Sequence, residues 1–337
     1  MPSLSITPPS DFFLPRDVCS YGYFLLAPNY WDPRAKTLWR VLNLVDGPVL
    51  THISQTRKGG RLSIKLSRGV SKQERLTLVE QVTRMLRLDE TSEHISHFHK
   101  LDKRHKKSGR GRLFRSPTLF EDVIKTVTSC NVTWPSTINM NRRLCEVVGD
   151  EVPLASTVAF PKMRTDVAST FRAFAFPTAA QIAQTRVATL RARCRVGYRD
   201  QRIVDLAKLF STPVAKGGFD AAKIENPATS DDDVFDALID LPGIGPYAAA
   251  NIMQLLGRYA RLPLDTESVR HGRTMLGFKG SSAQVMKKVK RHFEPMGDQA
   301  FRSYWFEMWT FYESKHGPAW TWERDTTGRM FTAALLK

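Results

Sequence analysis

Residues 241–251 have the sequence Leu241-Pro242-Gly243-Ile244-Gly245-Pro246-Tyr247-Ala248-Ala249-Ala250-Asn251. Two glycines one residue apart, between two helical segments, allow a tight turn with exposed backbone N–H groups. The second helix then presents its positive N-terminal end at the same place, which suits one phosphate group. Gly-x-Gly alone also occurs in ordinary interhelical turns. The longer pattern, which ends in a helix of small residues that can pack closely, favours a phosphate-binding hairpin.

An aspartate follows this hairpin. Asp265 lies eighteen residues after Tyr247, at the N-cap position of another expected helix. An aspartate that only caps a helix is common. A carboxylate at a helix N-terminus also stays ionised and can stabilise a cationic sugar or orient a water molecule. Both roles are open at this point.

The chain has 337 residues, enough for two or three domains with a buried core. Its 50 Lys and Arg against 33 Asp and Glu give a net charge of +17, which favours a polyanionic partner such as nucleic acid. No apolar stretch approaches the roughly 18–20 residues of a membrane span, and the first residues do not resemble a secretory signal. We therefore expect no membrane association and an intracellular location: cytoplasm or nucleoid in a bacterium, nucleus or organelle in a eukaryote.

The four cysteines are scattered, without a C-x-x-C pair: Cys19, Cys130, Cys145 and Cys194. This spacing argues against a zinc site, an iron–sulfur cluster and a disulfide framework. We expect free thiols in a reducing compartment.

The first third of the chain favours a small α+β domain with an antiparallel sheet, over residues 11–98, after a Pro- and Ser-rich tail at 1–10. A helix is expected after Ser71, which forms a capping box with Glu74. Strands are expected at Tyr21–Leu26, Leu38–Val45 and Arg61–Leu66.

A basic linker is expected over residues 99–115. From Lys100 to Arg115 there are eight Lys and Arg and one acid, Asp102. A solvated connection and a phosphate-facing loop are both consistent with this run.

From residue 116 to 337 the helical period dominates, which predicts one all-α domain or two helical lobes. Helices are expected at 178–190, 199–210, 230–240, 246–257, 266–276, 282–293 and 297–315.

Together these features resemble the helix-hairpin-helix (HhH-GPD) DNA glycosylases, which carry a Gly/Pro-rich loop and an aspartate. The hairpin Leu241–Pro246 and Asp265 match that signature in order and spacing. Gly197-Tyr198-Arg199 resembles the family's segment ahead of the hairpin. The resemblance covers roughly residues 115–315 and implies a helical glycosylase domain. The α+β segment is similar in placement to the accessory domain of 3-methyladenine DNA glycosylase II and 8-oxoguanine DNA glycosylase.

The resemblance implies roles for individual residues. Asp265 corresponds to the catalytic carboxylate, and Gly243, Gly245 and Ala248 would offer N–H groups to a phosphate. Asn131 aligns with a position that fills the space left by the extruded nucleotide, although helix capping explains it equally well.

Two further assignments follow from the resemblance. Hairpin carbonyls of this family can bind a monovalent cation, which here implies Ile239, Leu241 and Ile244 as ligands of Na⁺ or K⁺. No other cofactor is expected. Arg270 is expected to contact a phosphate or to lie on the surface.

One position departs from part of the family. The bifunctional branch carries a lysine directly after the Gly-x-Gly-x turn, where this chain has Tyr247. Tyrosine cannot form a Schiff base, which argues against lyase activity. Tyr247, Trp305 and Trp309 are candidates for an aromatic base pocket, although helical spacing predicts burial for most aromatic residues of 301–312.

We therefore expect a monomeric, monofunctional DNA glycosylase acting on double-stranded DNA that contains a damaged base, with an alkylated purine as the favoured substrate. Two alternatives remain: an oxidised-base glycosylase/lyase of the 8-oxoguanine type, and a helix-hairpin-helix DNA-binding protein without chemistry. Asp265 discriminates the second alternative, because a pure binding module needs no carboxylate there.

Overall fold

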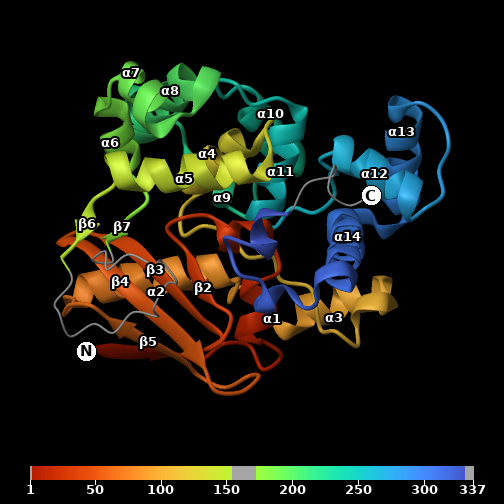
Figure 1. Cartoon of the computed structure of the whole chain (residues 1–337), viewed down its shortest axis with the longest axis horizontal. Coiled ribbons are helices and arrows are strands. Elements are labelled where there is room, and N and C mark those ends of the chain that lie inside the picture. The colour runs from red at the N-terminus through yellow and green to blue at the C-terminus, as the bar shows by residue number, and fades with distance from the viewer. Residues whose placement is uncertain (1, 154–171, 331–337) are drawn as a thin grey trace.

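The computed structural model describes residues 2–153 and 172–330, and Figure 1 shows a sheet on one side of a larger set of helices. The five-stranded sheet is antiparallel, with strand order β1-β5-β4-β3-β2. Its strands are β1 (Ser3–Ile6), β2 (Tyr30–Asp32), β3 (Thr37–Leu44), β4 (Gly47–Gln55) and β5 (Leu62–Leu66). Residues 1–10, expected to be a tail, thus contribute an edge strand, because β1 pairs with β5.

Both faces of this sheet are covered. Helix α2 (Lys72–Leu86) packs on one face, and its capping box between Ser71 and Glu74 is confirmed. On the other face, Trp39 and Val41 of β3 pack against Val152 of β6 (Glu151–Val152), which pairs with β7 (Ala173–Phe174). Successive side chains of β3 point to opposite faces of the sheet, and because both faces are buried, apolar residues occur on both sides of the strand.

The expected strand at Tyr21–Leu26 is wrong. This stretch contains a 3₁₀ helix at Gly22–Leu25, which follows the short helix α1 (Leu14–Val18). Its apolar and aromatic residues are buried by packing against helices rather than by strand pairing: the Tyr21 ring lies 4.8 Å from the ring of Trp305. A run of apolar residues predicts burial, but it does not specify which element provides it.

Most of the expected helices are confirmed, with bounds shifted by a few residues. The helix expected at 178–190 is broken at Thr185–Arg186 into two shorter helices, followed by a π-helical turn at Leu190–Cys194. The remaining helices are α3 (Ser92–Leu101), α4 (Leu119–Ser129), α5 (Trp134–Val148), α6 (Ala179–Gln184), α7 (Val187–Thr189), α8 (Asp200–Ser211), α9 (Ala221–Glu225), α10 (Asp231–Ile239), α11 (Pro246–Leu256), α12 (Thr266–Thr274), α13 (Ser282–Phe293) and α14 (Ala300–His316).

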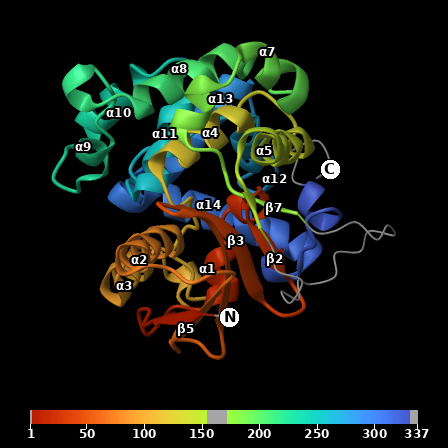
Figure 2. The ribbon, with the colours of Figure 1, turned by 90° about the vertical axis from the view of Figure 1, so that its left-hand side faces the viewer.

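Two large hydrophobic cores organise these elements. One lies among α4–α11, and the other joins the sheet and α2 to α12–α14. In Figure 2, α14 lies between the sheet and the helices α11, α12 and α13. The C-terminal helices therefore share their core with the N-terminal sheet. Helix α11 contributes to both cores, with Leu255 in the core that contains the sheet and Ile252 in the other.

The arginines of the basic run at 99–115 have structural roles, whereas its lysines are exposed. Helix α3 continues to Leu101, and the Arg112 side chain is only 1% exposed. Arg112 pairs with Asp11 at 2.6 Å, and Nη1 of Arg115 donates to the Leu255 carbonyl at 2.9 Å. These two arginines are therefore neither solvated nor open to a phosphate, because buried partners hold them. A count of charges along the sequence cannot reveal such partners.

Among the described residues, no helix is both long enough and apolar enough to cross a membrane.

Candidate active site

The hairpin between α10 and α11 is built around one glycine with a left-handed conformation. Gly243 has φ +76°, and a Cβ placed there would lie 2.5 Å from Cδ of Arg202. Leu241 and Ile244 anchor the turn in the core, where the Ile244 N–H donates to the Leu241 carbonyl at 3.0 Å. Anchored residues thus alternate with exposed Gly243 and Gly245, so the backbone of the turn faces outward.

The first turn of α11 supplies N–H donors beside this loop. The helix begins at Pro246, which has no N–H, and the Ala249 N–H already donates to the Gly245 carbonyl at 2.9 Å. In an α-helix the N–H groups of the first turn have no acceptor within the helix, which here concerns Tyr247 and Ala248. No other heavy atom lies within 4 Å of the position of a Cβ at Gly245. An anion can therefore approach this backbone closely.

Asp265 is the N-cap of α12, and its two carboxylate oxygens have different partners. Oδ1 accepts hydrogen bonds from the N–H groups of Glu267 at 2.9 Å and Ser268 at 3.0 Å. Oδ2 accepts a hydrogen bond from the phenol of Tyr247 at 3.1 Å. The first turn of α11 and the first turn of α12 therefore meet at this carboxylate, and its orientation is fixed from both sides.

Burial dominates the electrostatics of this pair. It raises the pKa of Asp265, although the N–H groups of α12 and the Tyr247 hydroxyl oppose the rise by favouring the charged form. Burial also raises the pKa of Tyr247, and the negative charge of Asp265 adds to the effect. The phenol therefore remains a protonated donor, facing a carboxylate that is poorly solvated.

A second layer supports the cap from α14. The Asp265 N–H donates to Oγ of Ser268 at 3.2 Å, and that oxygen lies 2.8 Å from the hydroxyl of Tyr304. One turn further along α12, Nε2 of buried His271 lies 2.8 Å from Oε1 of Glu307. Two side chains of α14 thus hold α12, and with it the carboxylate, in place.

A cluster of aromatic rings joins α14 to the residues that follow α1. The ring centres of Tyr21 and Trp305 lie 4.8 Å apart. The side-chain amide of Gln254 in α11 donates to the Tyr21 hydroxyl at 3.0 Å. The Trp305 indole N–H donates to the Ser20 carbonyl at 2.8 Å. Trp309 stacks behind Trp305 at 5.2 Å and is only 1% exposed, so it supports this cluster from within the core.

Several solved structures match the fold of this chain. No family model and no curated protein matches its sequence. MBOgg1, solved in complex with a low-affinity DNA ligand, gives a TM-score of 0.64 at 16% identity, over 91% of this chain and 96% of its own. The 3-methyladenine DNA glycosylase of Archaeoglobus fulgidus gives 0.62 at 16% identity, over 94% and 99%. The 8-oxoguanine glycosylase/lyase of Clostridium acetobutylicum, in its apo form, gives 0.63 at 15% identity, over 90% and 95%.

This chain has the fold of these DNA glycosylases. The resemblance inferred from the hairpin and Asp265 is thereby confirmed at the level of fold, and so is the fold class, a helical part preceded by a small antiparallel sheet. At such low identity the likeness concerns the fold, and the chemistry must be argued from this chain's own residues.

The glycosylase-like segment Gly197-Tyr198-Arg199 holds the end of α4. Nε of buried Arg199 donates to the Val127 carbonyl at 3.0 Å, and Nη2 donates to the carbonyls of Cys130 and Asn131. Asn131 itself is exposed and adopts a left-handed conformation with φ +50°. The arginine thus shapes the loop that presents Asn131 to solvent.

Of two further residues, Cys130 escaped sequence reasoning, whereas Tyr198 belongs to the Gly-Tyr-Arg motif. Cys130 is half-buried, and burial raises the pKa of its thiol to about 11, with a further contribution from the negative charge of Asp265. Tyr198 is 55% exposed, and the guanidinium groups of Arg199 and Arg202 lie 4.4 and 5.5 Å from its ring centre. The Gly-Tyr-Arg motif pointed to Tyr198, but no local signal placed Cys130 beside Asp265.

Arg270 is engaged within the protein. Its Nε donates to Oε1 of Glu267 at 2.7 Å, and its guanidinium lies 4.6 Å from the ring centre of Phe311. A phosphate approaching Arg270 would compete with Glu267 for these hydrogen bonds.

Neutral carbonyl oxygens are the donors that the hairpin offers to a monovalent cation. The Leu241 carbonyl accepts a hydrogen bond from the Ile244 N–H, which leaves one lone pair free. Ile239 is the last residue of α10, and the carbonyls of a last helical turn have no N–H partner within the helix. The donor set of Ile239, Leu241 and Ile244 is therefore chemically suited to Na⁺ or K⁺. Within the described residues, no group of three or more His, Cys, Asp or Glu is placed to hold a metal ion.

Proposed function

We propose that this protein is a DNA glycosylase of base-excision repair that hydrolyses the N-glycosidic bond of a damaged base, with an alkylated purine as its substrate. The observation that carries the proposal is the pairing of Tyr247 with Asp265 at 3.1 Å, at the junction of the hairpin helix and α12. This pairing joins the phosphate-binding hairpin to the oriented carboxylate of Asp265. It also places the hydroxyl of Tyr247 at the position where a lyase needs an amine.

Asp265 supplies the electrostatics of bond cleavage. Breaking an N-glycosidic bond leaves positive charge on the sugar, in a transition state with oxocarbenium character. A carboxylate with a fixed orientation and few solvating waters stabilises such charge more than one in bulk water. The N–H groups of Glu267 and Ser268 occupy Oδ1, so Oδ2 is the oxygen that faces the sugar or a water molecule.

Tyr247 defines the class of reaction. A monofunctional glycosylase uses water as the nucleophile and leaves an abasic strand, whereas a lyase forms a Schiff base between an amine and the sugar. The protonated phenol of Tyr247 has no such reactivity. It instead donates to Asp265 and holds the carboxylate ready.

The aromatic cluster supports the choice of substrate. N-alkylated purines such as 3- and 7-methyl derivatives carry positive charge, so they are good leaving groups before any protonation. The face of an aromatic ring attracts a cation by about 0.5–2 kcal/mol. Tyr247 contacts Asp265, and Tyr21 lies near this carboxylate. Tyr21 packs against Trp305, and Trp309 stacks behind Trp305.

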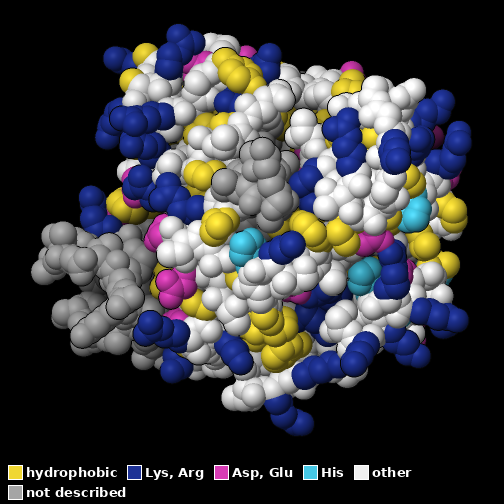
Figure 3. Space-filling view, turned by 45° about the vertical axis from the view of Figure 1, so that its right-hand side comes forward, with side chains coloured by type: hydrophobic (Ala, Val, Ile, Leu, Met, Phe, Trp, Pro, Cys, Tyr) yellow, Lys and Arg dark blue, Asp and Glu magenta, His cyan; other side chains and the backbone are white. Residues whose placement is uncertain are grey.

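Binding to double-stranded DNA follows from charge and from the hairpin. The Gly243–Ala248 backbone holds one phosphate, exposed Asn131 enters the duplex beside the flipped nucleotide, and the net charge of +17 attracts the polyanion. Lys and Arg side chains spread over much of the face seen in Figure 3. A Na⁺ or K⁺ at the hairpin carbonyls would add a positive charge near the phosphate.

The second candidate is an oxidised-base glycosylase/lyase. It is favoured by one similar structure, that of Clostridium acetobutylicum, which is an 8-oxoguanine glycosylase/lyase. Tyr247 argues against the lyase half of this activity. A DNA-binding protein without chemistry would need the hairpin, but it would not need a carboxylate that two N–H groups and the Tyr247 hydroxyl hold in place.

A screen of defined lesion duplexes, each assayed with and without alkali, tests the proposal. We expect free methylated purine, strand scission only after alkali, and no covalent adduct on borohydride reduction. A trapped Schiff base would contradict the monofunctional assignment. Excision of 8-oxoguanine with no action on alkylpurines would identify an oxidised base as the substrate. Inactivity on every lesion would support a DNA-binding protein without chemistry.

A further inference from the structure

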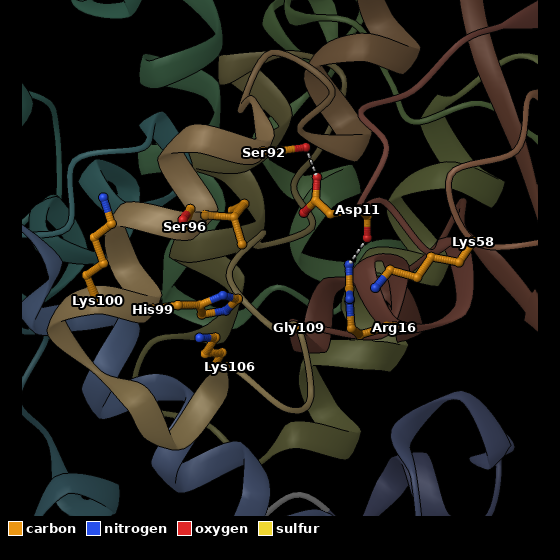
Figure 4. Close-up of a pocket in the computed structure, with 10 residues that line it drawn as sticks. Asp11, Arg16, Lys58, Ser92, Ser96, His99, Lys100, Lys106 and Gly109 are labelled. Atoms are coloured by element: carbon orange, nitrogen blue, oxygen red, sulfur yellow. Dashed lines mark hydrogen bonds between the residues drawn. The ribbon is translucent and has the colours of Figure 1, made fainter.

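A cavity of about 350 Å³ lies away from Asp265, in the N-terminal part of the molecule. Helix α3 forms one wall, and the other walls come from the α1 region, the β4–β5 connection and the loop that follows α3 (Figure 4). It shares no lining residue with the hairpin or with the Tyr247–Asp265 pair. We call it the α3 pocket.

Positive charge from four separate segments lines the α3 pocket. Its basic residues are Arg16 of α1, Lys58 of the β4–β5 connection, Lys100 of α3 and Lys106 of the following loop. Asp11 is the one acidic residue among the lining residues. In Figure 4, Lys58 reaches in from one side, while His99 and Lys106 lie on the other.

Most of this charge has no partner within the protein. Arg112 already neutralises Asp11 at 2.6 Å, and Arg16 pairs with Asp17 at 2.7 Å. Within residues 2–153 and 172–330, no acidic group forms an ion pair with Lys58, Lys100 or Lys106. These three ammonium groups are exposed, so water weakens their mutual repulsion, and their positive charge is available to an anion that enters the cavity.

The frame of the pocket is rigid. Nη2 of Arg16 donates to the Asp11 carbonyl at 2.9 Å, in addition to its pairing with Asp17. Gly109, with φ +69°, lets the loop close over this arginine, because a Cβ there would lie 2.3 Å from Nη1. The guanidinium is therefore fixed before any ligand arrives, which reduces the entropy lost on binding.

Helix α3 contributes polar groups and an apolar floor. Ser92 and Ser96 lie one turn apart on the face that lines the pocket, with Ile95 beside them. The Ser92 hydroxyl already donates to Asp11, so Ser96 supplies the hydroxyl that faces a ligand. Nε2 of His99 donates to the Arg110 carbonyl at 2.6 Å, so Nδ1 of the neutral ring is an acceptor and the lysines and Ser96 supply the donors. Hydroxyl donors and ammonium groups around one cavity are the set that phosphate oxygens accept from.

We propose that the α3 pocket binds a phosphate group of a ligand other than the flipped nucleotide. The volume exceeds that of a single phosphate ion and lies at the small end of the range for small-molecule sites, roughly 300–1,000 Å³. A phosphodiester of a nucleic-acid strand and the phosphate of a small ester share the chemistry that this pocket recognises. The proposal does not depend on the glycosylase reaction.

Paired lysine substitutions in the full-length protein test this site. The variant Lys58→Gln/Lys106→Gln removes two charges from the α3 pocket. The control Lys65→Gln/Lys72→Gln removes two charges from exposed positions of the same part of the molecule, outside the pocket. Because all four side chains are exposed, both variants are expected to fold, which a matching thermal unfolding curve verifies.

Two probes distinguish the source of the phosphate. We expect calorimetry to show pyrophosphate binding to the unmodified protein and to the control, and at least tenfold weaker binding to the pocket variant, which supports a free phosphate ester. If pyrophosphate does not bind, the affinity for undamaged duplex is measured as a function of salt concentration. A slope of log K against log[salt] that is smaller by about two in the pocket variant alone, where K is the association constant, supports a phosphodiester.

The proposal is overturned if the pocket variant and the control behave alike with both probes. Base excision, measured separately with saturating enzyme, depends on Asp265 and not on these lysines. A protein without glycosylase activity could therefore still bind pyrophosphate, and the two proposals fail independently.

Discussion

Asp265 is a helix cap and a reactive group at once, and the two roles use different oxygens. Oδ1 satisfies two N–H groups at the start of α12, while Oδ2 receives only the Tyr247 hydroxyl. Capping therefore fixes the orientation of the carboxylate without occupying the oxygen that can act. Burial raises the pKa of this group, so the charged form is held at some cost to stability.

Replacing Asp265 by Asn is expected to remove activity and to stabilise the protein. Loss of one charge-stabilising group lowers the rate of single-turnover excision by roughly 100-fold or more. An acid whose pKa is raised on folding destabilises the folded state once the pH exceeds that pKa, and a neutral amide removes this cost while still capping α12. The variant is therefore expected to have a higher Tm at pH 7.

Single-turnover kinetics on an alkylpurine duplex and thermal unfolding check these two outcomes. Binding to lesion DNA is expected to survive. Excision at the unmodified rate would show that Asp265 only caps the helix.

The hydroxyl of Tyr247 is expected to set the acidic limit of the reaction. Asp265 must be ionised to stabilise the sugar, so the excision rate falls as the pH drops through its pKa. Tyr247→Phe removes a hydrogen bond that favours the ionised form, which raises that pKa further. The acid limb of the single-turnover pH profile is then expected to move to higher pH. An unchanged limb would mean that Tyr247 does not act on Asp265.

At the scale of elements, the hairpin is expected to contribute affinity without selectivity. Gly245→Asp places a negative side chain at the exposed turn, where an added Cβ meets no other atom within 4 Å. Losing one charge-assisted contact of about 1.5–3 kcal/mol corresponds to roughly 10- to 100-fold weaker binding. Lesion and undamaged duplexes are expected to be affected alike, because phosphate contacts carry no sequence information.

Gly69→Asp provides the matched control for this experiment. Gly69 is also an exposed glycine with open space around its Cβ position, but it lies in the N-terminal part, so the same charge change there is expected to leave affinity nearly unchanged. Fluorescence anisotropy with both duplexes measures the effect. A loss confined to lesion DNA would argue that the turn contacts the damaged base.

The same elements show which parts of the site a sequence can predict. The hairpin and the cap of α12 depend on local signals, namely a glycine with positive φ, a proline at the first helical position and an N-cap aspartate. Tyr21 and Cys130 reach the site only through packing between distant segments. The bond from Trp305 to the Ser20 carbonyl, for example, spans 285 positions of the chain. No local pattern encodes such a contact, and the strand expected at Tyr21–Leu26 failed for the same reason.

At the scale of the whole molecule, a buried ionic cluster joins the sheet to the glycosylase-like helices. Glu121 of α4 lies 2.6 Å from Arg40 of β3 and 2.6 Å from Lys125, one turn along α4. All three side chains are almost fully buried. Burial alone would raise the pKa of Glu121, but the charges of Arg40 and Lys125 hold it below its ordinary value.

Breaking this cluster is expected to destabilise the entire fold, because Glu121→Gln leaves two buried cations without an anion. Removing one partner of a buried pair typically costs about 3–5 kcal/mol. Glu146→Gln provides the control, since the Arg142–Glu146 pair on α5 is exposed and such pairs contribute about 0–1 kcal/mol. A carboxyl whose pKa is lowered on folding stabilises the protein above its unfolded pKa, and this contribution disappears as the pH falls through the folded pKa. Urea unfolding at neutral pH is therefore expected to give a free energy of unfolding several kcal/mol lower for Glu121→Gln than for the unmodified protein.

This difference in the free energy of unfolding is expected to shrink as the pH falls. A difference no larger than that of Glu146→Gln would show that packing alone holds the sheet against α4.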